Sequence, residues 1–211
     1  MYKRQGLLVL KTVLRFLAGP LVLLASIAGI IHGIHATLAQ NLYFQVRYGV
    51  LKVSGTERIL ETCERSYQLY PLNYNLCSIA TDVAFLEADR ALDQVSRDRL
   101  LSDSGKWCER GLALNTYSRD LNLRKAGLLG AGGGGAAKAV EHWERYTDWQ
   151  YWNPENHYIL GQMYVWAGEL EKAKRCAVLV GKWEYGALLM KSIDDERTRN
   201  TVLLPGKAIP K

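Results

Sequence analysis

The sequence predicts an all-α protein: one N-terminal transmembrane helix, followed by a domain of helical repeats. Three observations carry this prediction. Residues 16–34 contain no charged residue. The chain after residue 56 divides into helix-length segments separated by short breaks that hold Pro and Gly. Parts of those segments recur along the chain. With 48% hydrophobic and 23% charged residues, the composition is that of a globular rather than a disordered protein.

The net charge of +6 is concentrated at the N-terminus. Lys3, Arg4, Lys11 and Arg15 all precede the first acidic residue, Glu57. Of the 27 basic residues, 23 remain without these four, against 21 acidic residues. The rest of the chain is therefore almost neutral, and we expect no nucleic-acid partner.

Residues 1–39 are predicted to be a basic flank and a transmembrane helix. The uncharged run from Phe16 to Ile34 continues to Ala39, which meets the roughly 20 residues that a span needs. Because the basic residues precede the run, the N-terminus is expected in the cytoplasm. The C-terminal part would lie in the periplasm of a bacterium, held by a single pass through the inner membrane. A cleaved signal peptide is the alternative, although its apolar core is usually only about 7–15 residues long.

Residues 40–55 are predicted to be a juxtamembrane linker. Their short alternating stretch fits a strand or a continuation of the helix. Ser54-Gly55-Thr56-Glu57 then has the pattern of a capping box, which predicts a helix that runs to about Tyr70.

The clearest repeat lies in residues 157–179. Its pattern is Leu160-Gly161 followed by Tyr164, Gly168, Ala173 and Ala177. Shifting back by 34 residues places Gly161 on Gly127 and Ala173 on Ala139. This segment resembles the tetratricopeptide repeat (TPR), in which two helices cross at a small residue. The resemblance implies a TPR-like α-solenoid over residues 56–190, followed by a C-terminal tail at 191–211.

The other repeats depart from this pattern. Helices are expected at 120–130 and 136–151, with Gly130 where the family has an aromatic and Tyr185 where it commonly has Pro. The glycine run at 132–135 is expected to form a mobile turn. Cys63-Glu64-Arg65 recurs as Cys108-Glu109-Arg110 after 45 residues rather than 34. This longer spacing predicts about 11 inserted residues between Ala88 and Ser104, as an extended loop or a longer helix.

The sequence contains no pattern typical of an enzyme or a metal site. The four cysteines, Cys63, Cys77, Cys108 and Cys176, form no Cys-x-x-Cys pair. We interpret them as small core residues, with disulfides as the alternative in an oxidising compartment. No signature of a nucleophile, a phosphate-binding loop or a metal site is present, so we expect neither catalysis nor a bound metal.

Two histidines near the outer end of the span suggest the second hypothesis. His32 and His35 lie three residues apart on one helix face, and Ala28 leaves space one turn before His32. Such a histidine can ligate haem or bacteriochlorophyll. In this alternative the chain is a structural subunit of a photosynthetic or electron-transfer membrane complex. The main expectation remains that no cofactor is bound.

The leading hypothesis is a protein–protein interaction scaffold or accessory subunit whose partners are other integral-membrane proteins. The concave surface of a solenoid is built mainly by the first helix of each pair. A third hypothesis makes the chain a partner of envelope polysaccharide machinery. The candidate partner-binding residues are polar or aromatic: Tyr74, Asn75, Asn122, Lys125, His157, Tyr158, Trp149, Trp152 and Trp166. Residues 193–211 are expected to be irregular and to strap over a partner.

Overall fold

The computed structural model describes residues 2–49, 55–131 and 135–203, and within these ranges it contains helices and turns but no strand. The side chains of residues 18–49, 55–131 and 135–199 are described. The chain forms two compact units, Met1–Leu76 and Cys77–Lys211. Their boundary falls in the first turn of α3 (Tyr74–Arg90). The glycine turn at 132–134 lies outside the described residues, so the prediction of its mobility is not tested.

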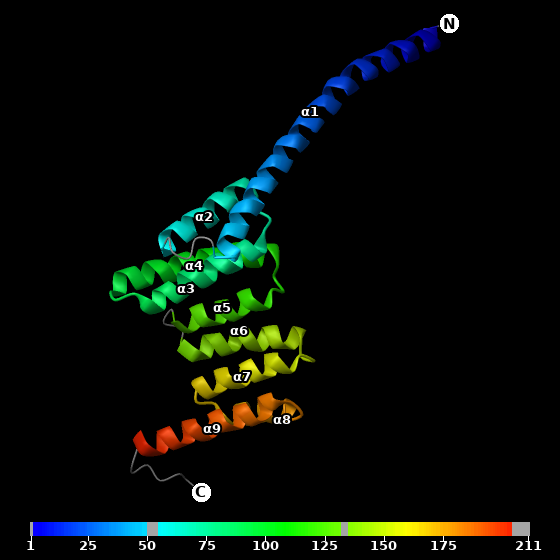
Figure 1. Cartoon of the computed structure of the whole chain (residues 1–211). Helices are drawn as coiled ribbons and strands as arrows, with labels where there is room; N and C mark the ends of the chain where they lie inside the picture. Colours follow the sequence, from blue (N-terminus) through cyan, green and yellow to red (C-terminus); the bar gives the residue numbers. More distant parts are fainter. Residues whose placement is uncertain (1, 50–54, 132–134, 204–211) are drawn as a thin grey trace. The chain divides into compact units, whose positions relative to one another are not determined.

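The first unit is dominated by the long helix α1 (Tyr2–Arg47), which Figure 1 shows as one continuous, gently curved rod. Within the described residues, Ala18–Arg47 is long and apolar enough to cross a membrane, and none of its most apolar stretch is buried. Residues 40–47 of the predicted linker continue this helix rather than forming a strand. The helical alternative for this stretch is therefore confirmed.

Helix α2 (Thr56–Leu69) packs antiparallel against the last part of α1. Ala39 is buried in this contact, and the Ser66 hydroxyl donates to the Ala39 carbonyl at 2.9 Å. The N-cap of α2 is Gly55 at φ 82°, a left-handed conformation that favours glycine, and no side chain caps the helix. The expectation that a capping box begins this helix is therefore wrong, because a glycine occupies the cap position.

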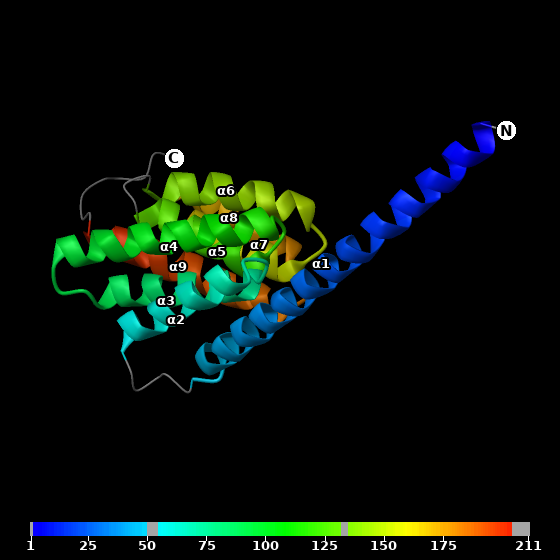
Figure 2. The same cartoon turned by 90° about the horizontal axis from the view of Figure 1, so that it is seen from above.

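The second unit is a stack of antiparallel helices (Figures 1 and 2). Helix α3 is followed by α4 (Gln94–Leu114), and α5 (Arg119–Leu129) by α6 (Gly135–Trp149). Next come α7 (Pro154–Trp166), α8 (Leu170–Leu179) and α9 (Glu184–Leu203). Helix α7 contacts α6, α8 and α9, so each repeat packs on its neighbours along the chain, as in a solenoid.

The insertion predicted between Ala88 and Ser104 is accommodated by longer helices. Helices α3 and α4 contain 17 and 21 residues, whereas α5 to α8 contain 10 to 15. The short turn between them exposes Leu92 completely. The longer-helix alternative is thus correct, and no extended loop forms here.

Helix α7 begins as its sequence predicts. Asn153 is the N-cap, and its side chain accepts from the backbone N–H of Glu155 at 3.0 Å. Pro154 follows at the start of the helix, where its missing N–H costs no hydrogen bond.

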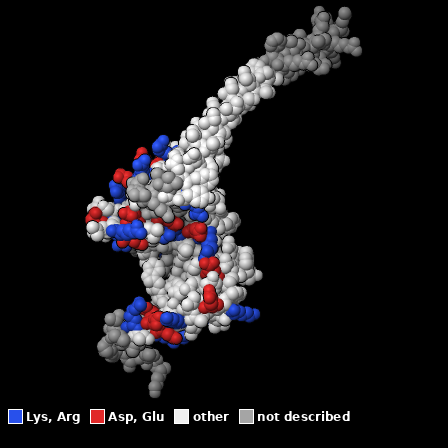
Figure 3. Space-filling model, in the orientation of Figure 1, with Lys and Arg blue, Asp and Glu red and all other residues white. Residues whose placement is uncertain are grey.

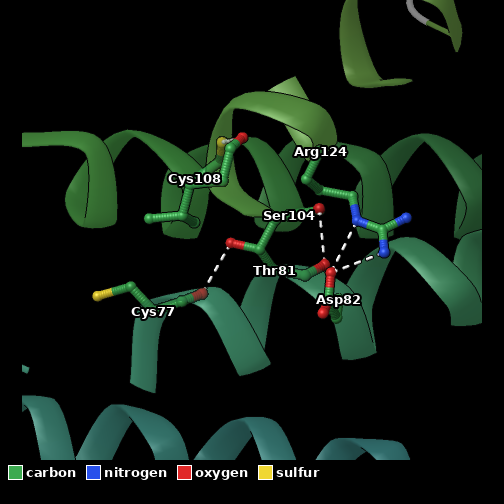
Figure 4. Close-up of polar contacts among 7 residues, drawn as sticks. Cys77, Thr81, Asp82, Ser104, Cys108 and Arg124 are labelled. Carbon is green, nitrogen blue, oxygen red and sulfur yellow. Dashed lines mark hydrogen bonds and ion pairs between the residues drawn. The ribbon is translucent and has the colours of Figure 1, made fainter. Parts of the chain in front are cut away.

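Buried and half-buried polar contacts join α3, α4 and α5 (Figure 4). The Ser104 hydroxyl of α4 donates to the Thr81 carbonyl of α3 at 2.9 Å. Arg124 of α5 donates to a carboxylate oxygen of Asp82 on α3 at 2.7 Å. Helix α3 is therefore joined to α4 by a side-chain-to-backbone hydrogen bond and to α5 by an ion pair, which limits how these helices can slide.

Glycines mark the places where helices of the stack cross most closely. A Cβ at position 161 on α7 would collide with Leu189 Cδ2 of α9 and lie 3.1 Å from Cys176 Cβ of α8. At Gly111 on α4, a Cβ would lie 2.6 Å from Leu121 Cδ1 and 2.9 Å from Cys77 Cβ. A side chain at either crossing would have to displace a leucine side chain and would press on a cysteine Cβ.

The C-terminal segment differs from its prediction. Residues 184–203 form α9, and Leu189 and Ile193 are fully buried against the core of the stack. The expectation of an irregular strap is therefore wrong for the described part, because burial of these two side chains stabilises a helix. Residues 204–211 lie outside the described residues.

All four cysteines are buried and none of them is in a disulfide, as their interpretation as core residues expects. Burial raises the pKa of the Cys108 thiol to about 12 and that of the Cys176 thiol to about 11. Protonated, buried thiols of this kind are unreactive, because the thiolate is the nucleophile.

The crossing at Gly161 can be tested with a matched pair of alanine substitutions. Gly161→Ala is expected to lower the free energy of unfolding by about 1–3 kcal/mol through overpacking. Gly105→Ala on α4, where a Cβ meets nothing within 4 Å, should raise it by about 0.5–1 kcal/mol. Denaturant unfolding of the full chain, followed by circular dichroism, measures both. Equal effects of the two substitutions would contradict the close crossing.

The state of the thiols can be tested by alkylation. We expect iodoacetamide at neutral pH to leave the four cysteines of the folded chain unmodified, because each is buried. After unfolding without a reductant, all four should be alkylated, as counted by mass spectrometry. Alkylation of only two cysteines after unfolding would reveal a disulfide and contradict the structure.

Candidate protein-binding surface

The structure separates the predicted residues on α7 onto two faces of the helix. His157 lines a cleft of about 430 Å³, whereas Tyr158 stacks on Tyr185 of α9 with ring centroids 5.1 Å apart. Neighbouring residues on a helix point about 100° apart, and of these two only His157 lines the cleft. The residues predicted together as one groove on α7 therefore belong to two surfaces.

The cleft that contains His157 lies between α6 and α8, and α7 forms its floor. Leu160 and Tyr164 of α7 line it, with Thr147 and Asp148 from α6 and Arg175 from α8. At one end the Tyr164 hydroxyl donates to Glu144, and Lys172 lies 3.9 Å from the same carboxylate. Burial, reinforced by this carboxylate, raises the pKa of Tyr164.

Thr147 differs from His157, the other polar residue considered in this cleft, in the hydrogen bonding of its side chain. It is 3% exposed, and its hydroxyl has no hydrogen-bond partner among the described residues. The ring nitrogen of His157, by contrast, is bound to the Tyr151 carbonyl. A buried hydroxyl without a partner carries a desolvation cost that the folded chain does not recover.

Trp166 lies at the C-terminal end of α7 and is 57% exposed. Its ring covers Gly130 at the end of α5, because a Cβ at position 130 would collide with the ring and lie 2.8 Å from Cζ3. This contact explains why position 130 lacks the aromatic that the TPR pattern has there: the space is taken by the tryptophan of the following repeat. Trp166 is therefore both exposed and held in place.

The predicted residues of α5 make contacts inside the second unit. Asn122 is buried, and its amide donates to the carbonyls of Thr116 and Ser118 at 2.9 Å and 2.8 Å. His142 Nε2 lies 3.1 Å from its Oδ1. Burial, followed by nearby cations, lowers the pKa of His142. Lys125 forms an ion pair with Glu109 of α4.

The remaining predicted partner residues are more exposed. Trp149 and Trp152 lie at and after the end of α6, and both are exposed, Trp152 to 68%. In the first turn of α3, Tyr74 is half-buried and Asn75 is exposed. On the face drawn in Figure 3, the surface over α5 to α7 is hollowed and carries few charged side chains, and charges gather over α4 and over α8 and α9. Partner binding by these residues stays a prediction.

The two histidines of the span lie on the exposed surface of α1. The His32 ring lies beside Tyr70, at the C-cap of α2, with ring centroids 5.5 Å apart. A groove of about 740 Å³ lies further along α1 and is lined by uncharged residues that include Phe44, Tyr48 and Tyr70. Ligation of haem or bacteriochlorophyll by His32 or His35 stays a prediction. Within the described part of the chain, no three His, Cys, Asp or Glu side chains are grouped as a metal site.

Comparison with known proteins supports the architecture. No family model and no curated protein matches the chain. Among solved structures, the chain is similar to a thermophilic TPR protein in Thermus thermophilus, with a TM-score of 0.58. The chain has a TPR-like fold. The match covers 79% of this chain and 82% of the other at 18% sequence identity, so it bears on the fold alone.

The unpartnered hydroxyl of Thr147 gives a prediction for stability. Thr147→Val keeps the side-chain shape and removes the buried hydroxyl, so it is expected to raise the free energy of unfolding by about 1 kcal/mol. The matched control is Thr81→Val, which removes a hydroxyl that donates to the Cys77 carbonyl at 2.7 Å. The control should lower the free energy of unfolding by about 1 kcal/mol. If both variants are destabilised equally in denaturant, the Thr147 hydroxyl has a partner after all.

Proposed function

We propose that the chain is a membrane-anchored scaffold or accessory subunit whose TPR-like domain binds other proteins. The observation that supports this most is the TPR-like stack itself, because solenoids of this kind present extended concave surfaces to protein partners. We expect this role to be non-enzymatic, as is typical of TPR-like repeat folds.

The anchor in this proposal is α1. A single-pass anchor and a signal sequence share the length and apolarity of Ala18–Arg47. The contact of α1 with α2 favours an anchor, because Ala39 and Ser66 connect the helix to the next element of the fold. Removal of the helix would leave α2 without this partner. The basic N-terminal flank favours a cytoplasmic N-terminus and a repeat domain on the opposite, periplasmic side.

Anchoring would restrict the partners to proteins of the same membrane. A domain tethered beside a membrane complex meets its subunits at a high effective concentration, so modest contacts are sufficient for assembly. This supports integral-membrane proteins as partners.

Trp166 is the residue that we expect to contribute most to this binding. Exposed tryptophans held by their neighbours are typical anchors of protein interfaces, and truncation of such an anchor often costs about 2 kcal/mol or more. The ring of Trp166 is more than half exposed, and Gly130 supports it. Its binding conformation would therefore need little reordering.

The test is crosslinking in native membranes, followed by mild-detergent purification of the tagged full chain. Trp166→Ala should reduce the co-purified partner subunits at least tenfold. The control Leu92→Ala, at a fully exposed position of the α3–α4 turn, should leave them unchanged. Fractionation after alkaline washing should keep the chain with the membrane. Release of the chain by alkali would contradict the anchor, and equal capture by both variants would contradict the role of Trp166.

A further inference from the structure

Exposed aromatic side chains gather along one edge of the second unit. The helices alternate in direction, so the turns after α4, α6 and α8 lie at the same edge, on the right in Figure 1. Each of these turns, or the helix end beside it, carries exposed aromatic rings. We call this set the aromatic edge: Tyr117, Trp149, Tyr151, Trp152 and Trp183.

The rings of the aromatic edge are packed against one another. Tyr117 and Trp149, from successive turns, have ring centroids 4.8 Å apart, and Tyr151 and Trp152 lie 5.6 Å apart. Trp149 also lies 6.4 Å from Tyr146, which is buried in the core. The aromatic edge is therefore packed against the core through Trp149 and Tyr146, while Tyr151 and Trp152 each remain 68% exposed.

The opposite edge has a different composition. The turn after α3 is Ala91-Leu92-Asp93, and the turn after α7 is Ala167-Gly168-Glu169. Residues 130–134 between α5 and α6 are glycine and alanine. Exposed aromatic rings are thus concentrated at the aromatic edge, whereas the opposite edge carries Trp166 at the end of α7.

The charged residues near the aromatic edge do not indicate a partner of either charge. Arg119 forms an ion pair with Glu155 at 2.5 Å, and these two residues begin α5 and α7 next to the aromatic turns. Asp148 and Lys182, of opposite sign, are both exposed nearby. With charges so mixed, attraction to a strongly anionic or cationic surface is weak, and the rings themselves must supply the contact.

Trp and Tyr have an apolar ring and a polar N–H or O–H group, and such rings are enriched where membrane meets water. The same chain carries an apolar helix of membrane-spanning length with no buried residue in its most apolar stretch. We propose that the aromatic edge rests in the headgroup region of the bilayer that holds α1. This inference depends on the membrane anchor of the proposed function and adds a second point of attachment.

The second attachment would set the direction in which the repeats face. Helix α7 has its first turn at the aromatic edge and Trp166 at its other end, 13 residues or about 20 Å away. With the edge in the headgroups, Trp166 points away from the lipid and toward the aqueous phase. Because α1 already tethers the chain, a weak aromatic contact is enough to hold this orientation.

The experiment uses the full chain in phosphatidylcholine nanodiscs that contain brominated lipids, which quench nearby tryptophans. All six tryptophans lie in the second unit, so the span adds no signal. We expect clear quenching of the wild-type chain. The triple variant Trp149→Phe, Trp152→Phe, Trp183→Phe should lose at least half of it. The matched control Trp166→Phe removes an exposed tryptophan from the opposite edge and should retain all of it.

Several outcomes would overturn the inference. Absence of quenching in chains that have inserted into nanodiscs, or equal losses in the triple variant and in Trp166→Phe, would show that the edge is not in lipid. Loss of quenching in 0.5 M salt would show a charge-driven contact instead. Circular dichroism confirms that each variant is folded. Failure of the chain to insert at all would contradict the anchor itself, whereas insertion without quenching contradicts only the aromatic edge.

Discussion

Helix α7 can lie against both α8 and α9 because residue 161 has no side chain. Leu189 of α9 occupies the space where a Cβ would stand, and Cys176 of α8 closes it from the other side. Gly111 has the same function where α4 meets α5. Between these crossings the contacts are made by small residues that include Ala126, Ala139 and Ala173, all fully buried. Glycine and alanine thus allow the helices to lie close together at these contacts.

Tight crossings leave room in the core for few large rings. Trp143 and Tyr146 fill that space, with ring centroids 4.7 Å apart, and Trp143 donates its indole N–H to the Asn156 carbonyl at 3.1 Å. Trp107 and Tyr164 are also buried, whereas Tyr117, Trp149, Tyr151, Trp152, Trp166 and Trp183 lie at turns and helix ends and stay exposed. The composition of the outer surface is thus linked to the packing inside.

The sequence predicts the central repeats well because their signal is local. The helices predicted at 120–130 and 136–151 agree with α5 and α6 within about two residues. Helix α9 is not predicted from the sequence because it is stabilised by the tertiary burial of Leu189 and Ile193. No local sequence pattern indicates this burial. Site residues are harder to predict. His157 and Tyr158 are neighbours in sequence, yet only the three-dimensional packing shows that they face different surfaces, and Asn122 uses its amide within the domain.

The continuity of α1 has a consequence for how the anchor and the first folded element are coupled. The helix passes without a break from its apolar stretch to the residues that α2 covers. In the proposed anchor, the side of α1 that would face lipid and the side that contacts α2 therefore have a fixed angular relation. Each added or deleted residue between them would turn that relation by about 100°. Rotation of α1 about its axis would therefore turn α2 with it, so α1 would transmit rotation to α2 rather than act as a flexible tether.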